Sequence, residues 1–308
     1  MASLTFSACQ RHSEARFDVK EFVSENLCKS PRRVEILLPK DYDANKNERY
    51  AVLYMYDCQN IFHDSLSYTG ISWGVKETTE MLADSGIIKP LIVVGIDNAG
   101  ELRGNEYSPK KLVQRIRKKD PNYFDGKGDY LNNDSLLYSD EFLKFVVTEL
   151  KPYIDSTYRT LPGRENTAIM GSSLGGLMSL YAYLEYPEVF GRVACISTHW
   201  PVSYGDNTTT GTYAYAELIK ERWGEIEPPV KIYFDYGTET IDAGYINKQP
   251  IIDSLFTALE YPAANYRSKC FEGKDHSERS WRERLPEIMK FLWGVILRST
   301  FCIAPTCL

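Results

Sequence analysis

Short runs rich in β-branched and other apolar residues alternate along the chain with longer segments whose apolar residues recur at helical spacing. The short runs predict strands at residues 32–39, 50–57, 90–97, 166–171, 192–198, 230–237 and 265–273. The longer segments predict helices at residues 73–84, 139–155, 174–186, 212–223, 249–259 and 280–297. This alternation is typical of a mostly parallel sheet covered by helices on both faces. The pattern therefore predicts an α/β fold.

The same pattern indicates a single domain. The predicted elements follow one another without an internal repeat and without a linker rich in Pro, Gly or Ser. We therefore expect an N-terminal segment at 1–31, one α/β domain at 32–298 and a C-terminal tail at 299–308. A long irregular stretch at 99–137 interrupts the domain, and loops of that length often have a function of their own.

Composition and charge exclude several kinds of partner. The chain has 308 residues, of which 43% are hydrophobic, and this is enough for one large core. The formal net charge is -6, and no block of basic residues could neutralise the phosphates of a nucleic acid. The longest apolar run, at 291–297, is shorter than the roughly 20 residues that a membrane span needs. We expect neither a nucleic-acid partner nor a membrane span.

The seven cysteines bear on metal binding and on the cellular compartment. None has the spacing of a metal-ligand motif, so we expect no metal site. Because the number is odd, at least one thiol is free or joins another chain, although Cys302 and Cys307 could form a disulfide. The start, MASLTFSACQ, lacks the basic and apolar regions of a complete signal peptide, yet LTFSAC resembles the end of a lipoprotein signal. The choice between a cytoplasmic and an exported protein stays open, as does the oligomeric state.

A candidate nucleophile lies in the stretch GSSLGG, residues 171–176, between a predicted strand and a predicted helix. Only Ser173 fits the centre of a G-x-S-x-G motif, since Ser172 would need glycines where Met170 and Leu174 stand. The motif alone arises by chance about once in ten chains of this length, but the flanking strand and helix remove most of that chance. In a nucleophile elbow the glycines let strand and helix approach, and the serine projects at the carboxyl end of the sheet. We therefore interpret Ser173 as a nucleophile in preference to a residue of a plain tight turn.

A serine nucleophile needs a base, and in this architecture the histidine follows both the serine and the acid along the chain. The four histidines are His12, His63, His199 and His276. The first two precede Ser173, and His199 comes too soon after it for a strand bearing the acid to intervene. The order of residues therefore selects His276, in the loop between the last predicted strand and the last predicted helix.

These motifs together resemble the putative esterase family of the α/β-hydrolase superfamily. The resemblance is carried by YAVLYMYDCQNIF, PLIVVGIDNAGELRGNEYSP, IMGSSLGGLMSLYAYLEYPEVFGRVACIS, YFDYGTETID and FEGKDHSERSWRERLPEIMKFLWG. It implies a serine ester hydrolase without a cofactor, in which Ser173 and His276 are the nucleophile and the base. The family includes carbohydrate esterases for acetyl and feruloyl groups and esterases for enterobactin-type siderophores. The ester therefore stays open between these classes, and a catalytically silent binding scaffold is a third alternative.

The resemblance also indicates where an oxyanion would be held. Relatives commonly carry Asp-Gly-Gln-Asn or His-Gly after the second strand predicted above, whereas this chain has Cys58 between Asp57 and Gln59. We expect one N–H donor from Leu174 and a second from Gln59 or Cys58. A cysteine restricts the backbone where glycine would not, so the geometry of this loop needs testing. The plainer interpretation of the Cys58 side chain is a small buried apolar group.

Three carboxylates could serve as the acid of the triad. Asp235 lies inside the predicted strand 230–237, whereas Glu239 and Asp242 lie in the loop at its carboxyl end. Relatives usually place the acid roughly three residues after the glycine of this loop, where the present chain has Thr240. We favour Asp242, because its short side chain is fixed more easily than the longer one of Glu239, which remains the alternative.

Four further residues are candidates for the substrate cleft or its support. We expect Trp200, at the end of a strand, to line the cleft, and Trp73 either to do so or to pack in the core. Arg103 and Glu106 are expected to form an ion pair that fixes their loop.

Overall fold

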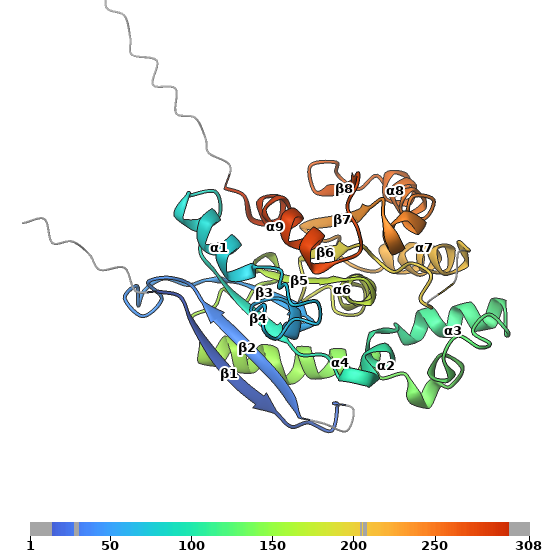
Figure 1. Cartoon of the computed structure of the whole chain (residues 1–308), viewed down its shortest axis with the longest axis horizontal. Helices are drawn as coiled ribbons and strands as arrows, with labels where there is room; N and C mark the ends of the chain where they lie inside the picture. The colour runs from blue at the N-terminus through green and yellow to red at the C-terminus, as the bar shows by residue number, and fades with distance from the viewer. Residues whose placement is uncertain (1–13, 28–30, 204, 206–207, 296–308) are drawn as a thin grey trace, which may run out of the picture.

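The computed structural model describes residues 14–27, 31–203, 205 and 208–295 (Figure 1). Its centre is an eight-stranded sheet in the order β1-β2-β4-β3-β5-β6-β7-β8. The strands are β1 (Arg16–Phe22), β2 (Arg32–Leu38), β3 (Ala51–Tyr56), β4 (Leu91–Ile96), β5 (Thr167–Ser172), β6 (Arg192–Ile196), β7 (Lys231–Gly237) and β8 (Tyr266–Phe271). Strand β2 pairs antiparallel with both β1 and β4, and all other neighbouring strands pair parallel. The predicted α/β fold with a mostly parallel sheet is confirmed.

Helices cover both faces of the sheet. One face carries α1 (Val75–Asp84) and α9 (Glu278–Trp293), which pack beside each other. The other carries α2 (Arg103–Tyr107), α3 (Lys110–Lys119), α4 (Ser139–Phe145), the π-helical turn η5 (Val146–Leu150), α5 (Lys151–Thr157), α6 (Leu174–Glu185), α7 (Thr210–Trp223) and α8 (Gln249–Ala258). Figure 1 shows α2 and α3 at one end of the molecule, where α3 packs beside α7. Short 3₁₀ turns complete the chain: η1 (Cys58–Asn60), η2 (Gly100–Leu102), η3 (Asp129–Asn132), η4 (Asp134–Leu136), η6 (Arg164–Asn166) and η7 (Thr240–Tyr245).

Strand β3 shows why the sequences of the central strands are continuous apolar runs. Val52, Tyr54 and Tyr56 point into the core on the side of α6, whereas Leu53 and Met55 point into the core beneath α1 and α9. Successive side chains of a strand face opposite ways, and here both faces are buried. A parallel sheet covered on both sides therefore favours apolar residues on both faces of its central strands.

The structure corrects the N-terminal boundary of the domain. Strand β1 lies within the segment 1–31, yet it pairs along its whole length with β2 and so belongs to the sheet. The prediction missed it because a mostly exposed edge strand, here RFDVKEF, has no continuous apolar pattern. The predicted tail 299–308, with Cys302 and Cys307, and the start of the chain up to residue 13 lie outside the described residues.

The long irregular stretch 99–137 is more ordered than expected. It contains α2, α3 and three 3₁₀ turns, and apolar residues of α3 join the larger core cluster. Charged residues dominate the sequence of α3, KKLVQRIRKK, and only Leu112, Val113 and Ile116 are buried. Such a helix depends on tertiary contacts for its stability, which a sequence pattern underestimates.

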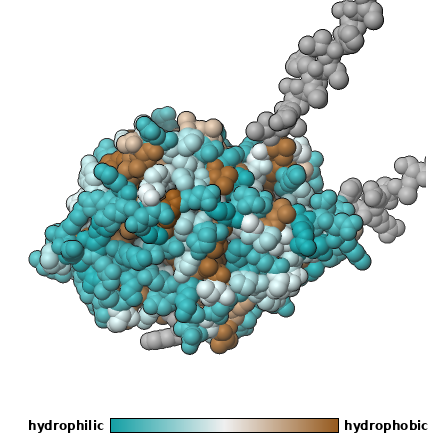
Figure 2. Space-filling view, turned by 180° about the vertical axis from the view of Figure 1, so that it is seen from behind, coloured by the Kyte–Doolittle hydropathy of each residue, from teal (hydrophilic) through white to brown (hydrophobic). Residues whose placement is uncertain are grey.

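The surface is predominantly polar. On the face shown in Figure 2, hydrophilic residues prevail and hydrophobic ones form small separate groups. No helix in the described part of the chain combines the length and the apolar character needed to cross a membrane. Among the described cysteines, Cys58, Cys195 and Cys270 are free thiols, and the first two are buried.

Candidate active site

Ser173 occupies a strained turn between β5 and α6. Its backbone has φ 59° and ψ -122°, a left-handed φ that residues other than glycine rarely adopt. Two main-chain hydrogen bonds hold the turn: the Ser173 N–H donates to Ile196 O at 2.9 Å, and the His199 N–H donates to Ser173 O at 3.1 Å. Strain of this kind persists only where the surroundings impose it, and it is concentrated at functional sites.

The glycines around Ser173 are needed for packing, but not all to the same degree. A Cβ on Gly171 would lie 2.8 Å from Gly175 O, and one on Gly176 would lie 2.9 Å from Thr198 Oγ1. A Cβ on Gly175 would have no neighbour nearer than 3.5 Å. The expectation that the glycines on both sides of the serine must lack a side chain therefore holds for Gly171 but not for Gly175.

We expect Gly171→Ala to lower the free energy of unfolding by about 1–3 kcal/mol, because the new methyl group overlaps main-chain atoms that cannot move aside cheaply. Gly175→Ala should change it by less than about 1 kcal/mol, since alanine favours the helix and meets only ordinary contacts. Urea unfolding of both variants provides the comparison. Equal losses in the two would contradict this account of the turn.

The structure brings Asp242 and His276 together. Asp242 lies in η7 after β7, His276 lies between β8 and α9, and Asp242 Oδ1 is 2.5 Å from His276 Nδ1. The buried Asp242 also accepts hydrogen bonds from Ser197 Oγ and from the Gly237 N–H, each at 2.6 Å. Burial alone would raise the pKa of Asp242, but its hydrogen bonds, led by the one to His276, lower the pKa overall. An ionised Asp242 can only accept, so Nδ1 of His276 donates the proton of this hydrogen bond.

The other carboxylates of this loop lie elsewhere. Glu239 is exposed. Asp235, inside β7, is fully buried and forms an ion pair with Arg284 of α9 at 3.1 Å. Burial raises the pKa of Asp235 to about 6, although the Arg284 guanidinium opposes the shift. Thr240, at the position where relatives usually carry the acid, accepts a hydrogen bond from the His276 N–H at 3.0 Å, so it supports the histidine loop.

The loop after β3 turns at Asp57, not at Cys58. Asp57 has φ 58° and ψ 50°, and its carboxylate accepts hydrogen bonds from Arg103 Nε at 2.7 Å, Arg103 Nη2 at 2.8 Å and Asn98 Nδ2 at 2.6 Å. Cys58 has no positive φ, and its side chain packs in the core against Gly95. Burial raises the pKa of the Cys58 thiol well above its usual value. The cysteine is therefore compatible with the turn and is an unreactive core residue.

Candidate oxyanion donors lie at the same edge of the sheet. The first N–H groups of a helix have no acceptor within it. Leu174 opens α6 and Cys58 opens η1, and these segments follow β5 and β3, which are parallel neighbours. The N–H groups of Leu174, Cys58 and Gln59 are thus available for a ligand at the carboxyl ends of the two strands.

The ion pair predicted between Arg103 and Glu106 is wrong. Arg103 binds Asp57, as described above, and the fully buried Glu106 binds Arg32 through two hydrogen bonds of 2.6 and 2.9 Å. Both residues lie in α2, but their partners, Asp57 after β3 and Arg32 in β2, are distant in the chain, so the local sequence does not reveal them.

A cleft of about 640 Å³ contains both Ser173 and His276. Leu66 and Tyr68, with 52% and 93% of their surface exposed, form an apolar part of its lining, and Trp281 forms another. Its polar lining is supplied by Asp57, Gln59, Asn60, Thr69, Asn98, Arg103, Ser172 and Glu278. The cleft therefore joins the candidate nucleophile and base to a surface that suits a partly aromatic, partly polar ligand.

The family model described as "Putative esterase" matches residues 24–292. The chain belongs to this family. It is similar to the uncharacterized protein YbbA of Bacillus subtilis (strain 168), with 24% identity over 173 residues that cover 55% of this chain and 58% of YbbA. It is also similar to an endo-1,4-beta-xylanase/feruloyl esterase of Xylanibacter ruminicola, with 24% identity over 282 residues that cover 88% of this chain and 30% of that protein. The chain thus spans less than two thirds of the length of each of these relatives.

A solved structure of an enterobactin esterase from Shigella flexneri, with 2,3-dihydroxy-N-benzoyl-serine present, has the same fold. The TM-score is 0.64 at 20% identity, and the alignment covers 91% of this chain and 59% of that one. This likeness shows a common fold, and the family match places the chain among the putative esterases.

Of the two tryptophans considered for the cleft, Trp200 differs from expectation and Trp73 takes the core position that was its alternative. Trp200 is fully buried and donates from Nε1 to Gln249 Oε1 at 3.0 Å, so it is a core residue and the prediction that it lines the cleft is wrong. Trp73 is also buried, and its ring packs behind that of Trp281 at 5.4 Å. Trp281 is buried in the same core cluster as Trp73, and it also lines the cleft with its ring 5.0 Å from that of His276. Its position five residues after His276, in the first turn of the last helix, is the signal that could have identified it.

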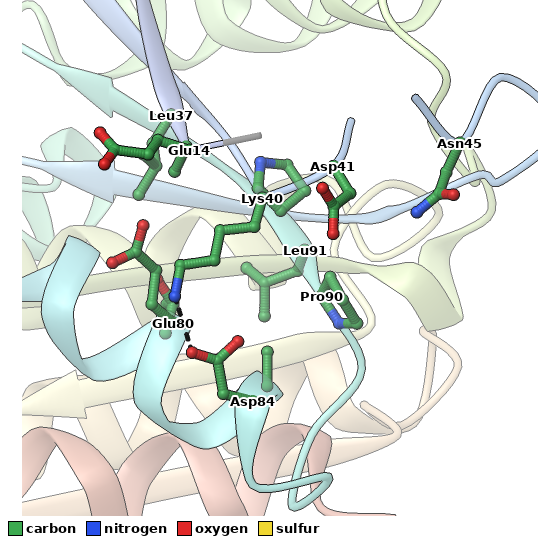
Figure 3. A pocket seen from close by; sticks show the side chains of 13 residues that line it. Glu14, Leu37, Lys40, Asp41, Asn45, Glu80, Asp84, Pro90 and Leu91 are labelled. Atoms are coloured by element: carbon green, nitrogen blue, oxygen red, sulfur yellow. Dashed lines mark hydrogen bonds and ion pairs between the residues drawn. The ribbon is translucent and has the colours of Figure 1, made fainter. Parts of the chain in front are cut away.

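A second hollow, of about 670 Å³, lies at the amino end of β4, away from Ser173 (Figure 3). Figure 3 shows Lys40 extending toward Glu80 and Asp84 of α1, and its Nζ lies 2.7 Å from Asp84 Oδ2. A hydrogen bond to Asp84 raises the pKa of Lys40. The described residues that line this second hollow provide an ion pair but no nucleophile or base arranged for ester chemistry. In the described residues, no group of His, Cys, Asp and Glu is placed to hold a metal ion.

Proposed function

We propose that the esterase is a serine carboxylic ester hydrolase with Ser173, His276 and Asp242 as its triad. The observation that carries the proposal is their arrangement: Ser173, in its strained turn, shares a cleft with His276, whose Nδ1 lies 2.5 Å from Asp242 Oδ1. Nucleophile, base and orienting acid are the three groups that this chemistry requires.

The reaction proceeds through an acyl-enzyme. Ser173 Oγ attacks the ester carbonyl carbon while His276 Nε2 takes its proton. The N–H groups of Leu174 and of Gln59 or Cys58 stabilise the oxyanion of the tetrahedral intermediate. Collapse of the intermediate breaks the bond to the alcohol, which receives the proton from His276. Water then attacks the acyl group by the same sequence, releasing the acid and restoring Ser173.

The favoured substrate is an acyl group on a carbohydrate, of the feruloyl or acetyl type. A relative that aligns with 88% of the chain is named as a xylanase and feruloyl esterase. The cleft is open, and Leu66, Tyr68 and Trp281 offer apolar and aromatic surface to a planar acyl group. Polar groups beside them, among them Asn98 and Gln59, can bind hydroxyl groups of the substrate.

A siderophore or other macrolactone is the second candidate. It is supported by the likeness to an enterobactin esterase. The guanidinium of Arg103 lies in the lining of the cleft, where it could attract an anionic or catechol-bearing ligand.

The two candidates are separated by turnover and product analysis. We would assay p-nitrophenyl acetate, acetylated xylan, a feruloylated oligosaccharide and a trilactone of acylserine under the same conditions. The favoured proposal expects release of ferulate or acetate from the carbohydrate esters at a kcat/KM well above that for the trilactone, and the opposite order would favour the second candidate. A phosphonylating reagent should label Ser173, and His276→Ala should abolish the labelling. Absence of both turnover and labelling would indicate a non-catalytic binding scaffold.

A further inference from the structure

A buried serine, Ser197, lies directly behind the proposed acid. It follows the last residue of β6 and has no exposed surface. Its φ of 42° is one of the few left-handed values outside glycine in the described chain. Its N–H donates to Asp235 O at 2.9 Å on the neighbouring strand. The surroundings therefore hold this residue in an unfavourable conformation, as they hold Ser173.

Three side chains fix the direction of the Ser197 hydroxyl. Trp281 Nε1 donates to Ser197 Oγ at 3.0 Å, and Arg284 Nη2 donates to it at 3.1 Å. An indole N–H and a guanidinium can only donate, so they occupy both lone pairs of the oxygen. The single hydroxyl proton must then point to the remaining neighbour, Asp242 Oδ2, at 2.6 Å.

This arrangement divides the two oxygens of Asp242 between different tasks. Oδ2 accepts from Ser197 and from the Gly237 N–H, and Oδ1 is left for His276 Nδ1. The carboxylate can neither rotate nor turn away from His276 without breaking one of these bonds. The hydroxyl also takes up part of the negative charge that would otherwise act more strongly on the imidazole.

Charged groups surround Asp242, and the neutral Ser197 hydroxyl lies among them. Arg284, from α9, bonds to Asp235 of β7 at 3.1 Å and lies 3.6 Å from Asp242 Oδ2, beyond hydrogen-bond distance. The ring of Tyr245 from η7 lies 6.1 Å from that of His276, and Glu278 from α9 lines the same cleft. His199, whose Nδ1 lies 2.8 Å from the Tyr245 hydroxyl, also acts on His276, and burial lowers the pKa of His199 to about 4. Arg284 thus forms an ion pair with Asp242 Oδ2 and also donates to Ser197, whose hydroxyl donates to the same oxygen, while Oδ1 faces His276.

We infer that Ser197 is a positioning residue of the proposed reaction: its hydroxyl, turned by Trp281 and Arg284, orients the Asp242 carboxylate and sets how strongly it attracts the His276 proton. This inference rests on the proposed roles of Ser173, His276 and Asp242.

The test is Ser197→Ala. Without the hydroxyl, kcat/KM at neutral pH should fall by about 10- to 100-fold, the effect expected of one hydrogen bond to a charged group. Asp242 then attracts the proton of His276 more strongly, so the pKa of His276 rises and the base stays protonated to a higher pH. The acid limb of the kcat/KM profile should therefore move to higher pH. A loss of activity with an unmoved acid limb would reduce Ser197 to a structural role and overturn the inference, as would unchanged activity.

Two further variants separate the hydroxyl from the backbone. Ser197→Gly removes the hydroxyl but accepts a positive φ freely, so it should reproduce the shift seen in Ser197→Ala even if the alanine variant folds poorly. Ser179→Ala is the matched control, because Ser179 is equally buried and its hydroxyl bonds only to Gly175 O, at 2.8 Å. Its acid limb should stay where it is in the wild type. A shift in the control, or none in Ser197→Gly, would contradict the inference.

A readout that needs no turnover keeps this inference distinct from the proposed function. The ¹⁵N NMR signals of His276, assigned by their loss in His276→Gln, report its tautomer and its titration midpoint. We expect an Nδ1–H tautomer in the wild type and a higher midpoint in Ser197→Ala and Ser197→Gly. If the wild type cleaves no ester, the proposed function fails, while this shift would still support the positioning role. An unchanged midpoint in both variants would overturn the role whatever the activity.

Discussion

Ser173→Ala should lower kcat by roughly 10⁶, because the remaining donors and the base cannot replace the attacking oxygen. Alanine keeps the Cβ and removes only the hydroxyl, and the turn is held by main-chain bonds to Ile196 and His199. The fold should therefore survive. Steady-state turnover of the best ester from the substrate panel measures the loss, and circular dichroism checks the fold.

The neighbouring serine provides the control. Ser172 is the last residue of β5 and lines the same cleft, but its backbone has no positive φ. Ser172→Ala should keep most of the activity. Equal losses in the two variants would mean that the nucleophile has been assigned to the wrong turn position.

Asp242→Asn should lower kcat by roughly 10⁴. The amide keeps the shape of the carboxylate but removes its charge, and its NH₂ group cannot accept the proton of His276 Nδ1. His276 then loses the partner that fixes its tautomer and stabilises its charged form. Arg284 retains its ion pair with Asp235, so we expect the variant to fold. Turnover and thermal unfolding, measured side by side, distinguish a lost acid from a lost fold.

The matched variant for the acid is Glu239→Gln. Glu239 lies three residues before Asp242 and is exposed, so this change should leave kcat near the wild-type value. Near-normal turnover in Asp242→Asn combined with a large loss in Glu239→Gln would transfer the role of the acid to Glu239.

The fold was largely predictable because its central strands are buried on both faces. All seven strands expected from the sequence are present, and so are the six expected helices, with ends that differ by a few residues. The edge strand β1 and helix α3 were missed for the same reason, since charged residues on their exposed sides hide the apolar pattern. The spacing of apolar residues indicates which side chains are buried. It therefore identifies an element least well where one side of that element is exposed to solvent.

The candidate site was predictable where a motif has a local physical cause. The turn at Ser173 needs Gly171 beside it, and chain order alone selected His276. What the sequence could not give are contacts between side chains far apart in the chain. The bond between Asp57 and Arg103 spans 46 residues, and the bonds of Ser197 to Trp281 and Arg284 span 84 and 87. Trp200 was misassigned for this reason, because only tertiary packing decides whether a ring at the end of a strand faces a cleft or the core.

The register of two central strands sets the distance between the proposed oxyanion donors. β3 and β5 are hydrogen-bonded neighbours, with Met55 opposite Met170, and the donors at 58–59 and 174 follow at their ends. Main-chain bonds in the middle of a sheet are among the last to open in local fluctuations. Donors held in this way need no reorganisation when charge develops on the substrate. If these donors act as proposed, their electrostatic contribution to catalysis is in place once the sheet has folded, before the ester binds.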